Sequence, residues 1–92
     1  MTPDYRPRLA DRARLKFDRH ENRHLLLYPE KGLKLSPTAA EIVKRCDGSR
    51  TVAEIVLELR GLYATAPEGV IENEVSSFLG VLESRGLLTG GA

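Results

Sequence analysis

Hydrophobic and polar positions along the first third of the chain predict three short strands. Residues 13–17 alternate between apolar and charged side chains, the period of a strand with one buried face that would include Phe17. The apolar run 24–28 is typical of a central strand. In the turn 29–32, proline fixes one dihedral and glycine tolerates the strained one. Residues 33–35 then form a third strand, which the simplest antiparallel order leaves at a sheet edge.

Two helix start signals follow the third strand. Ser36 can cap a helix and Pro37 suits its first position, so we expect a helix that runs to about Cys46. Thr51 and Glu54 have the spacing of a capping box at the start of a second helix. The apolar face of this second helix consists of Val52, Ile55, Val56, Leu59, Leu62 and Tyr63.

A third helix is predicted from about residue 68 to residue 85, where Gly86 ends it. Helical periodicity defines its main buried stripe as Ile71, Val75, Phe78, Leu79 and Leu82. The same periodicity places Glu74, Val81 and Arg85 beside Phe78, so apolar surface extends over one flank of the helix. This flank is a candidate wall for a bound peptide.

These elements predict an α+β fold that resembles a winged helix-turn-helix, with a three-stranded antiparallel sheet followed by three α-helices. A chain of 92 residues can bury one modest core, so we expect a single domain over residues 12–88. Residues 1–11 contain two prolines and little periodicity, and we expect a flexible N-terminal arm there. We also expect a short flexible tail at residues 89–92.

Composition and candidate chemistry narrow the function. The chain has one cysteine, Cys46, which lies on the packed face of the first helix, and no set of metal ligands is discernible. His20 and His24 flank a polar turn and are expected to be solvated. No nucleophile, base and orienting group occur together, so we expect no enzyme activity, no metal and no cofactor. The chain shows no signal peptide or apolar membrane segment, and a cytoplasmic location is expected.

A winged helix-turn-helix also suggests DNA binding, which is the alternative function. The second helix would be the recognition helix. It carries Glu54 and Glu58 on its outer side, and its only basic residue is Arg60. Phosphates would be repelled by this surface. A net charge of +1 adds no general attraction to nucleic acid or to membranes.

The edge position of the third strand favours peptide binding instead. Unpaired N–H and C=O groups at a sheet edge can accept an extended peptide as an additional strand. Two alternatives remain open from the residues alone: the N-terminal arm caps this edge, or the edge pairs with a second copy of the chain in a strand-exchanged homodimer.

Four stretches carry a family resemblance, in order, over nearly the whole chain: 12–18, 26–35, 46–56 and 78–88. They resemble the PqqD family, peptide chaperones of pyrroloquinoline quinone biosynthesis. The resemblance implies that the chain binds a ribosomal precursor peptide and presents it to a radical S-adenosylmethionine (SAM) enzyme. The chaperone itself would perform no bond chemistry. Ser36 replaces the asparagine expected in many members, and both residues cap helices.

The resemblance also implies where the peptide binds. In related recognition elements, the leader segment joins the third strand and lies against the third helix. Lys34 and Arg85 would then contact acidic peptide residues, and Glu74 a basic one. The backbone partners would be Gly32, Leu33, Lys34 and Leu35. The apolar wall would be Val75, Phe78, Leu79, Val81 and Leu82, some of which must also serve the core.

Overall fold

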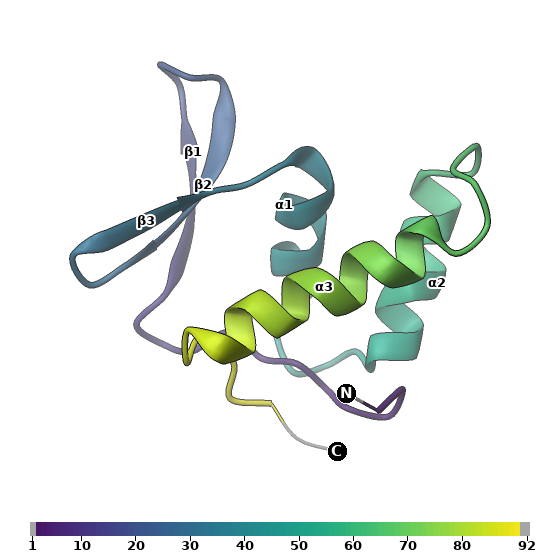
Figure 1. The fold of residues 1–92 in the computed structure, drawn as a ribbon. Helices are drawn as coiled ribbons and strands as arrows, with labels where there is room; N and C mark the ends of the chain where they lie inside the picture. The colour runs from purple at the N-terminus through teal and green to yellow at the C-terminus, as the bar shows by residue number, and fades with distance from the viewer. Residues whose placement is uncertain (1, 91–92) are drawn as a thin grey trace.

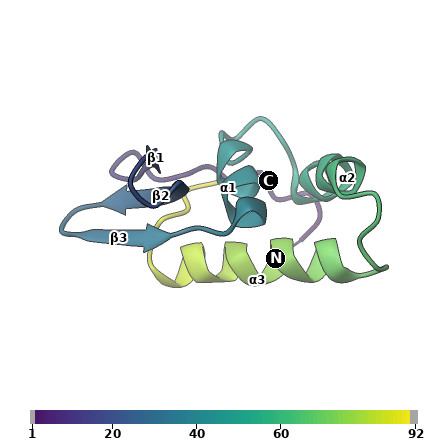
Figure 2. The same ribbon diagram turned by 90° about the horizontal axis from the view of Figure 1, so that it is seen from above.

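A computed structural model describes residues 2–90 and confirms the α+β fold with three antiparallel strands followed by three helices (Figure 1). The sheet has the order β1-β2-β3, so β2 is central and β3 lies at an edge. Figure 2 shows that β3 is the strand on the α3 side of the sheet, whereas β1 lies on the far side. The elements are β1 (Arg14–Asp18), β2 (Arg23–Tyr28), β3 (Lys31–Lys34), α1 (Pro37–Lys44), α2 (Val52–Leu62) and α3 (Val70–Ser84).

The β2–β3 turn is tighter than the sequence pattern predicts. Tyr28 pairs with Lys31, so only Pro29 and Glu30 form the loop and β3 begins two residues early. Glu30, with φ 63°, takes the left-handed conformation that was assigned to Gly32. Gly32 lies instead within β3 opposite Leu27, so the prediction that this glycine relieves the turn is wrong. Proline at the first loop position leaves the second residue to complete the reversal.

The predicted helix starts are confirmed. Ser36 Oγ accepts a hydrogen bond from Ala39 N at 3.1 Å, and Pro37 opens α1. Thr51 and Glu54 form the complete capping box at the start of α2, with each side chain accepting the other residue's backbone N–H. These contacts satisfy donors that the first turn of a helix leaves unpaired.

The core lies where one face of the sheet meets the three helices. Its fully buried side chains come from β2, α1, α2, α3 and the segment after α3. Two residues predicted to be buried are exposed, Phe17 at 45% and Leu62 at 56%. Phe17 lies near the end of the β1–β2 hairpin, where it contacts the His24 ring, and Leu62 is the last residue of α2. Periodicity alone does not reveal where the core ends.

The N-terminal segment, predicted to be a flexible arm, is docked in this structure. Leu9 N donates to Cys46 O and Ala10 N donates to Leu87 O, each at 2.8 Å. The carbonyls of Pro3 and Pro7 accept backbone hydrogen bonds from the helix–turn–helix, and Pro7 is fully buried. Proline lacks an N–H but keeps its carbonyl, so a segment without strand periodicity can still dock through acceptors. Of the predicted tail 89–92, only residues 89 and 90 are described.

Candidate functional site

The open edge of β3 has two residues whose backbone groups point away from the sheet. Leu35 N donates to His24 O at 3.0 Å, which makes these residues a hydrogen-bonded pair just beyond β3. In an antiparallel ladder such pairs alternate, so the N–H and C=O groups of Gly32 and Lys34 point outward. Within residues 2–90, no strand pairs with this edge. The site therefore offers backbone donors and acceptors along β3.

Residues 2–11, the described part of the N-terminal segment, do not cap this edge. Two of its isolated bridges join Arg8 to Asp47 and Leu9 to Leu88, which lie in the α1–α2 connection and after α3. The alternative that the arm occupies the third strand's edge is therefore wrong for this conformation.

The C-terminal part of α3 lies on the β3 side of the sheet (Figure 2), and one flank of this helix carries the residues predicted from helical spacing. Arg85 Nη1 donates to the hydroxyl of Tyr28 at 2.8 Å, which ties the C-terminal end of this flank to β2. Phe78 is half-buried against the core, and Val81 is 38% exposed. We call Glu74, Phe78, Val81 and Arg85 the α3 flank. It presents an apolar centre between one acidic and one basic residue.

Several other predicted wall residues belong to the core. Val75, Leu79 and Leu82 are fully buried. Their side chains have no surface left for a peptide, so their assignment as wall residues is wrong in this conformation. They lie on the α3 face that packs against α1 and α2. Leu33 is half-buried beside them and keeps some exposed surface next to the open edge.

The charged residues of the site differ in whether they already have an ion-pair partner within residues 2–90. Lys34 Nζ lies 3.1 Å from Glu21 Oε1, but both side chains are largely exposed, so this ion pair is weak. Neither Arg85 nor Glu74 has an ion-pair partner within residues 2–90. These two residues remain able to pair with charges on a bound peptide.

Cys46, the one cysteine of the chain, is buried in the core. Burial raises the pKa of the Cys46 thiol to about 12, and its Sγ donates to Ile42 O at 3.2 Å. The thiol is therefore protonated and unreactive near neutral pH.

Among residues 2–90, no group of His, Cys, Asp and Glu could hold a metal ion. In the same part of the chain, no helix is both long and apolar enough to span a membrane.

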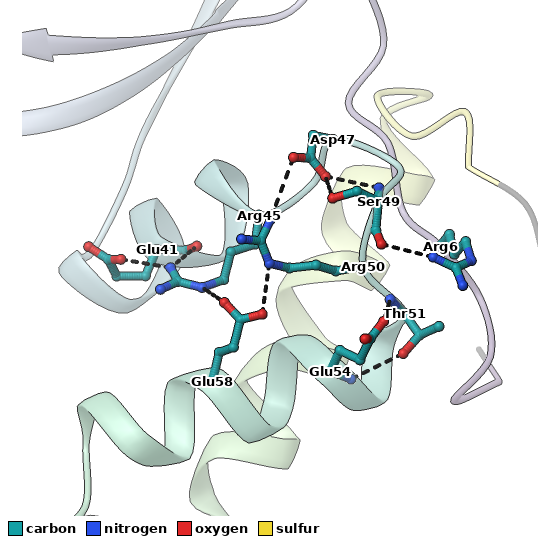
Figure 3. Close-up of polar contacts among 9 residues, drawn as sticks. All are labelled: Arg6, Glu41, Arg45, Asp47, Ser49, Arg50, Thr51, Glu54 and Glu58. Atoms are coloured by element: carbon teal, nitrogen blue, oxygen red, sulfur yellow. Dashed lines mark hydrogen bonds and ion pairs between the residues drawn. The ribbon is translucent and has the colours of Figure 1, made fainter.

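A network of ion pairs joins α1, the α1–α2 connection and α2 (Figure 3). Arg45 lies between Glu41 at 2.8 Å and Glu58 at 3.0 Å, and Arg50 reaches the second oxygen of Glu58 at 2.7 Å. Sequence reasoning missed this network because its members lie up to 17 positions apart. Two arginines near the start of α2 are thereby paired with carboxylates of the same domain.

Acid should weaken this network. Arg45, and then Lys44, hold the pKa of Glu41 below its ordinary value of 4.5, and Arg50 and Arg45 do the same for Glu58. A carboxylate with a lowered folded-state pKa stabilises the fold above its unfolded pKa, and this contribution is lost as pH falls through the folded value. We expect the melting temperature to fall from about pH 5 to about pH 3.

Removing both carboxylates isolates this contribution. Glu41→Gln with Glu58→Gln should lower the melting temperature by a few degrees at neutral pH and flatten its decline in acid. A matched control replaces Glu68 and Glu83, which have no ion pair among residues 2–90, with glutamine. Equal acid profiles for the two double variants, measured by circular dichroism, would contradict a role for the network.

Comparisons with known proteins relate this chain to one family. Residues 23–88 match the protein family described as coenzyme PQQ synthesis protein D, PqqD. A "PqqA binding protein" of Rhodopseudomonas palustris strain TIE-1 is 42% identical over 84 residues, covering 91% of this chain and 81% of the relative. A protein of the same description from Pseudomonas aeruginosa strain UCBPP-PA14 is 38% identical over 79 residues, covering 86% of this chain and 84% of the relative.

One solved structure shares the fold. It is the solution NMR structure of the PqqD truncation of Methylobacterium extorquens PqqCD, described as a functional, stand-alone recognition element for ribosomally synthesized and post-translationally modified peptides. Its TM-score against this chain is 0.75 at 35% identity, and the match covers 90% of this chain and 87% of that one.

Proposed function

This chain belongs to the family of coenzyme PQQ synthesis protein D, and we propose that it is a peptide chaperone that binds the PqqA precursor peptide. The peptide pairs with the open edge of β3 as a fourth strand and lies against the α3 flank. The observation that carries this proposal is the outward direction of the Gly32 and Lys34 backbone groups, at the sheet edge on the α3 side (Figure 2). Strand addition of this kind takes its affinity from main-chain hydrogen bonds and its specificity from adjacent side chains.

The chaperone acts together with a partner enzyme. On the family resemblance, we assign this role to a radical SAM enzyme that modifies the bound peptide in the cytoplasm. The chain itself performs no bond chemistry, which is supported by relatives described as binding proteins and by the protonated thiol of Cys46.

DNA binding is disfavoured by the charges around α2. Glu54 and Glu58 lie on the outer side of this helix, where a winged helix that binds DNA presents basic side chains. Arg45 and Arg50, which lie nearby, are paired with Glu58. A phosphate backbone at this surface would meet carboxylates and already neutralised arginines.

Amide hydrogen exchange tests the mode of binding. In the free chain, the amides of Gly32 and Lys34 should exchange fast, because their N–H groups point outward. Saturation with a synthetic PqqA peptide should slow both by about tenfold or more, as new main-chain hydrogen bonds form. The amide of Leu15 is the matched control, since the ladder register also points it outward, from the far edge at β1.

Two outcomes would overturn the proposal. The first is peptide binding that leaves the Gly32 and Lys34 amides unprotected. The second is protection of Leu15 to the same degree, which would indicate general rigidification. Protection of Gly32 and Lys34 that grows with protein concentration, without peptide, would instead assign the edge to a strand-exchanged homodimer.

A further inference from the structure

The face of the sheet opposite the core has two leucines at its centre. Leu26 is fully buried on the core face, and successive side chains of a strand point to opposite faces, so Leu25 and Leu27 lie on the other face. Both leucines are partly exposed, and within the described chain neither packs against the core. They line a recess of about 410 Å³ that extends toward the β1–β2 turn. The sheet therefore presents apolar side chains on a second face as well.

Basic side chains surround these leucines. Residues directly opposite each other in a ladder point to the same face, so Leu25 lies between Lys16 of β1 and Lys34 of β3. By the same register, Leu27 lies beside Arg14 of β1. We call this surface the outer sheet face, and it consists of Arg14, Lys16, Leu25, Leu27 and Lys34.

On the β3 side, Gly32 leaves Leu27 uncovered. Gly32 pairs with Leu27, and a Cβ added to this glycine would lie 3.4 Å from Leu27 Cδ2, in ordinary van der Waals contact. A larger residue at this position would therefore cover part of the leucine. The apolar centre of the outer sheet face stays open next to the edge of β3.

The outer sheet face carries an excess of positive charge. Arg14 and Lys16 are exposed and have no ion pair within residues 2–90. Lys34 has one, with Glu21 at 3.1 Å, and both of its side chains are largely exposed. Asp18, the acidic residue of β1, uses its carboxylate to accept a backbone hydrogen bond within the β1–β2 turn. An acidic partner surface with an apolar centre would complement this arrangement.

The outer sheet face adjoins the edge at which the peptide pairs. Lys34 belongs to both surfaces, because its backbone groups point outward along the edge and its side chain lies beside Leu25. A strand added to β3 extends both faces of the sheet, so every second side chain of the peptide would continue the outer sheet face. A protein bound to this face would therefore contact the chaperone and the peptide together.

We propose that the outer sheet face is the docking surface for the enzyme that modifies the bound peptide, and that this enzyme contacts it through acidic side chains around an apolar patch. The inference rests on the proposed function. The α3 flank is occupied by the peptide in that function, whereas the outer sheet face stays free. Because the peptide strand enlarges the same surface, the enzyme binds the loaded chaperone more tightly than the empty one.

Paired glutamine variants test the charge match. Arg14→Gln with Lys16→Gln should weaken binding of the purified radical SAM enzyme to the peptide-loaded chain about tenfold and reduce its dependence on salt. Affinity for a synthetic PqqA peptide should stay within about twofold, since neither residue belongs to β3. The matched control is Arg8→Gln with Arg60→Gln, which removes two charges from exposed, weak ion pairs elsewhere and should change enzyme affinity less than about twofold.

The wild-type chain provides a second readout in case the double variant does not fold. The methyl resonances of Leu25 and Leu27 should shift when the enzyme saturates the loaded chain, whereas those of buried Leu79 should not. Unmoved Leu25 and Leu27 signals at saturation, or equal losses of enzyme affinity in the two double variants, would overturn the inference. Equal affinity of the enzyme for loaded and empty chain would contradict the composite surface.

Protection of the Gly32 and Lys34 amides, measured in the same samples, separates this inference from the proposed function. If the peptide protects both amides while the enzyme does not use the outer sheet face, strand addition stands and only the docking surface fails. Without that protection, the proposed function itself fails. Shifts of Leu25 and Leu27 that grow with chain concentration alone would assign this face to a second copy, and salt-sensitive affinity for duplex DNA that the Arg14 and Lys16 double variant loses would assign it to nucleic acid. Either result contradicts docking of the enzyme.

Discussion

Leu79→Ala is expected to lower the free energy of unfolding by about 3 kcal/mol, because it leaves a cavity in a tightly packed core. Leu79 is fully buried on the face of α3 that packs against α1 and α2. Since a small domain has a total stability of roughly 5–15 kcal/mol, this is a large fraction of it. The melting temperature should fall by roughly 10–20 °C for a domain of this size. Urea unfolding followed by circular dichroism measures the change.

Val81→Gln is the matched comparison, two residues further along the same helix. Val81 is 38% exposed, so its replacement should change stability by no more than about 0.5 kcal/mol. It should weaken peptide binding by about fivefold, since roughly 1 kcal/mol of apolar contact is lost. For Leu79→Ala, affinity corrected for the folded fraction should stay near the wild-type value. The reverse pattern, with a stable Leu79→Ala that binds poorly, would show that the peptide reaches the core face of α3.

The contrast between Leu79 and Val81 also marks what periodicity can predict. Helical spacing placed Leu79 in the buried stripe and Val81 on the flank beside it, and the exposures of the two residues agree with that division. It did not show that Val75, Leu79 and Leu82 keep no accessible surface. That property depends on α1 and α2, which pack over the stripe from distant parts of the chain. Local signals, such as the Thr51 cap, were predicted without this information.

Features built from distant residues were not predicted. The docking of the N-terminal segment joins Leu9 to Cys46, and the Arg23 side chain donates to the carbonyl of Leu35. Neither contact leaves a periodic pattern, because each depends on how separate elements pack. The binding partner was therefore predicted from the resemblance of the four stretches to a known family. The residues alone predicted an open sheet edge and an apolar flank on the third helix.

Lys34→Pro is expected to weaken binding of the PqqA peptide by about tenfold. Proline has no N–H, so the variant lacks one outward donor, and its ring also obstructs the approach of a strand. One main-chain hydrogen bond contributes about 1 kcal/mol, and the obstruction adds to this loss. The fold should survive, because the N–H of Lys34 is not used in pairing with β2 and proline is tolerated at sheet edges. Isothermal titration measures the affinity.

Lys34→Ala separates the backbone donor from the side chain. This variant loses the ammonium and its exposed ion pair with Glu21 but keeps the N–H, so its affinity should stay within about threefold of wild type. If Lys34→Ala binds as poorly as Lys34→Pro, the contact at this position is electrostatic, and an acidic residue of the peptide rather than its backbone meets Lys34. If both variants bind normally while their spectra remain native, no strand forms on this edge. Only a selective loss in the proline variant, with unchanged circular dichroism, fits a peptide held through the backbone of β3.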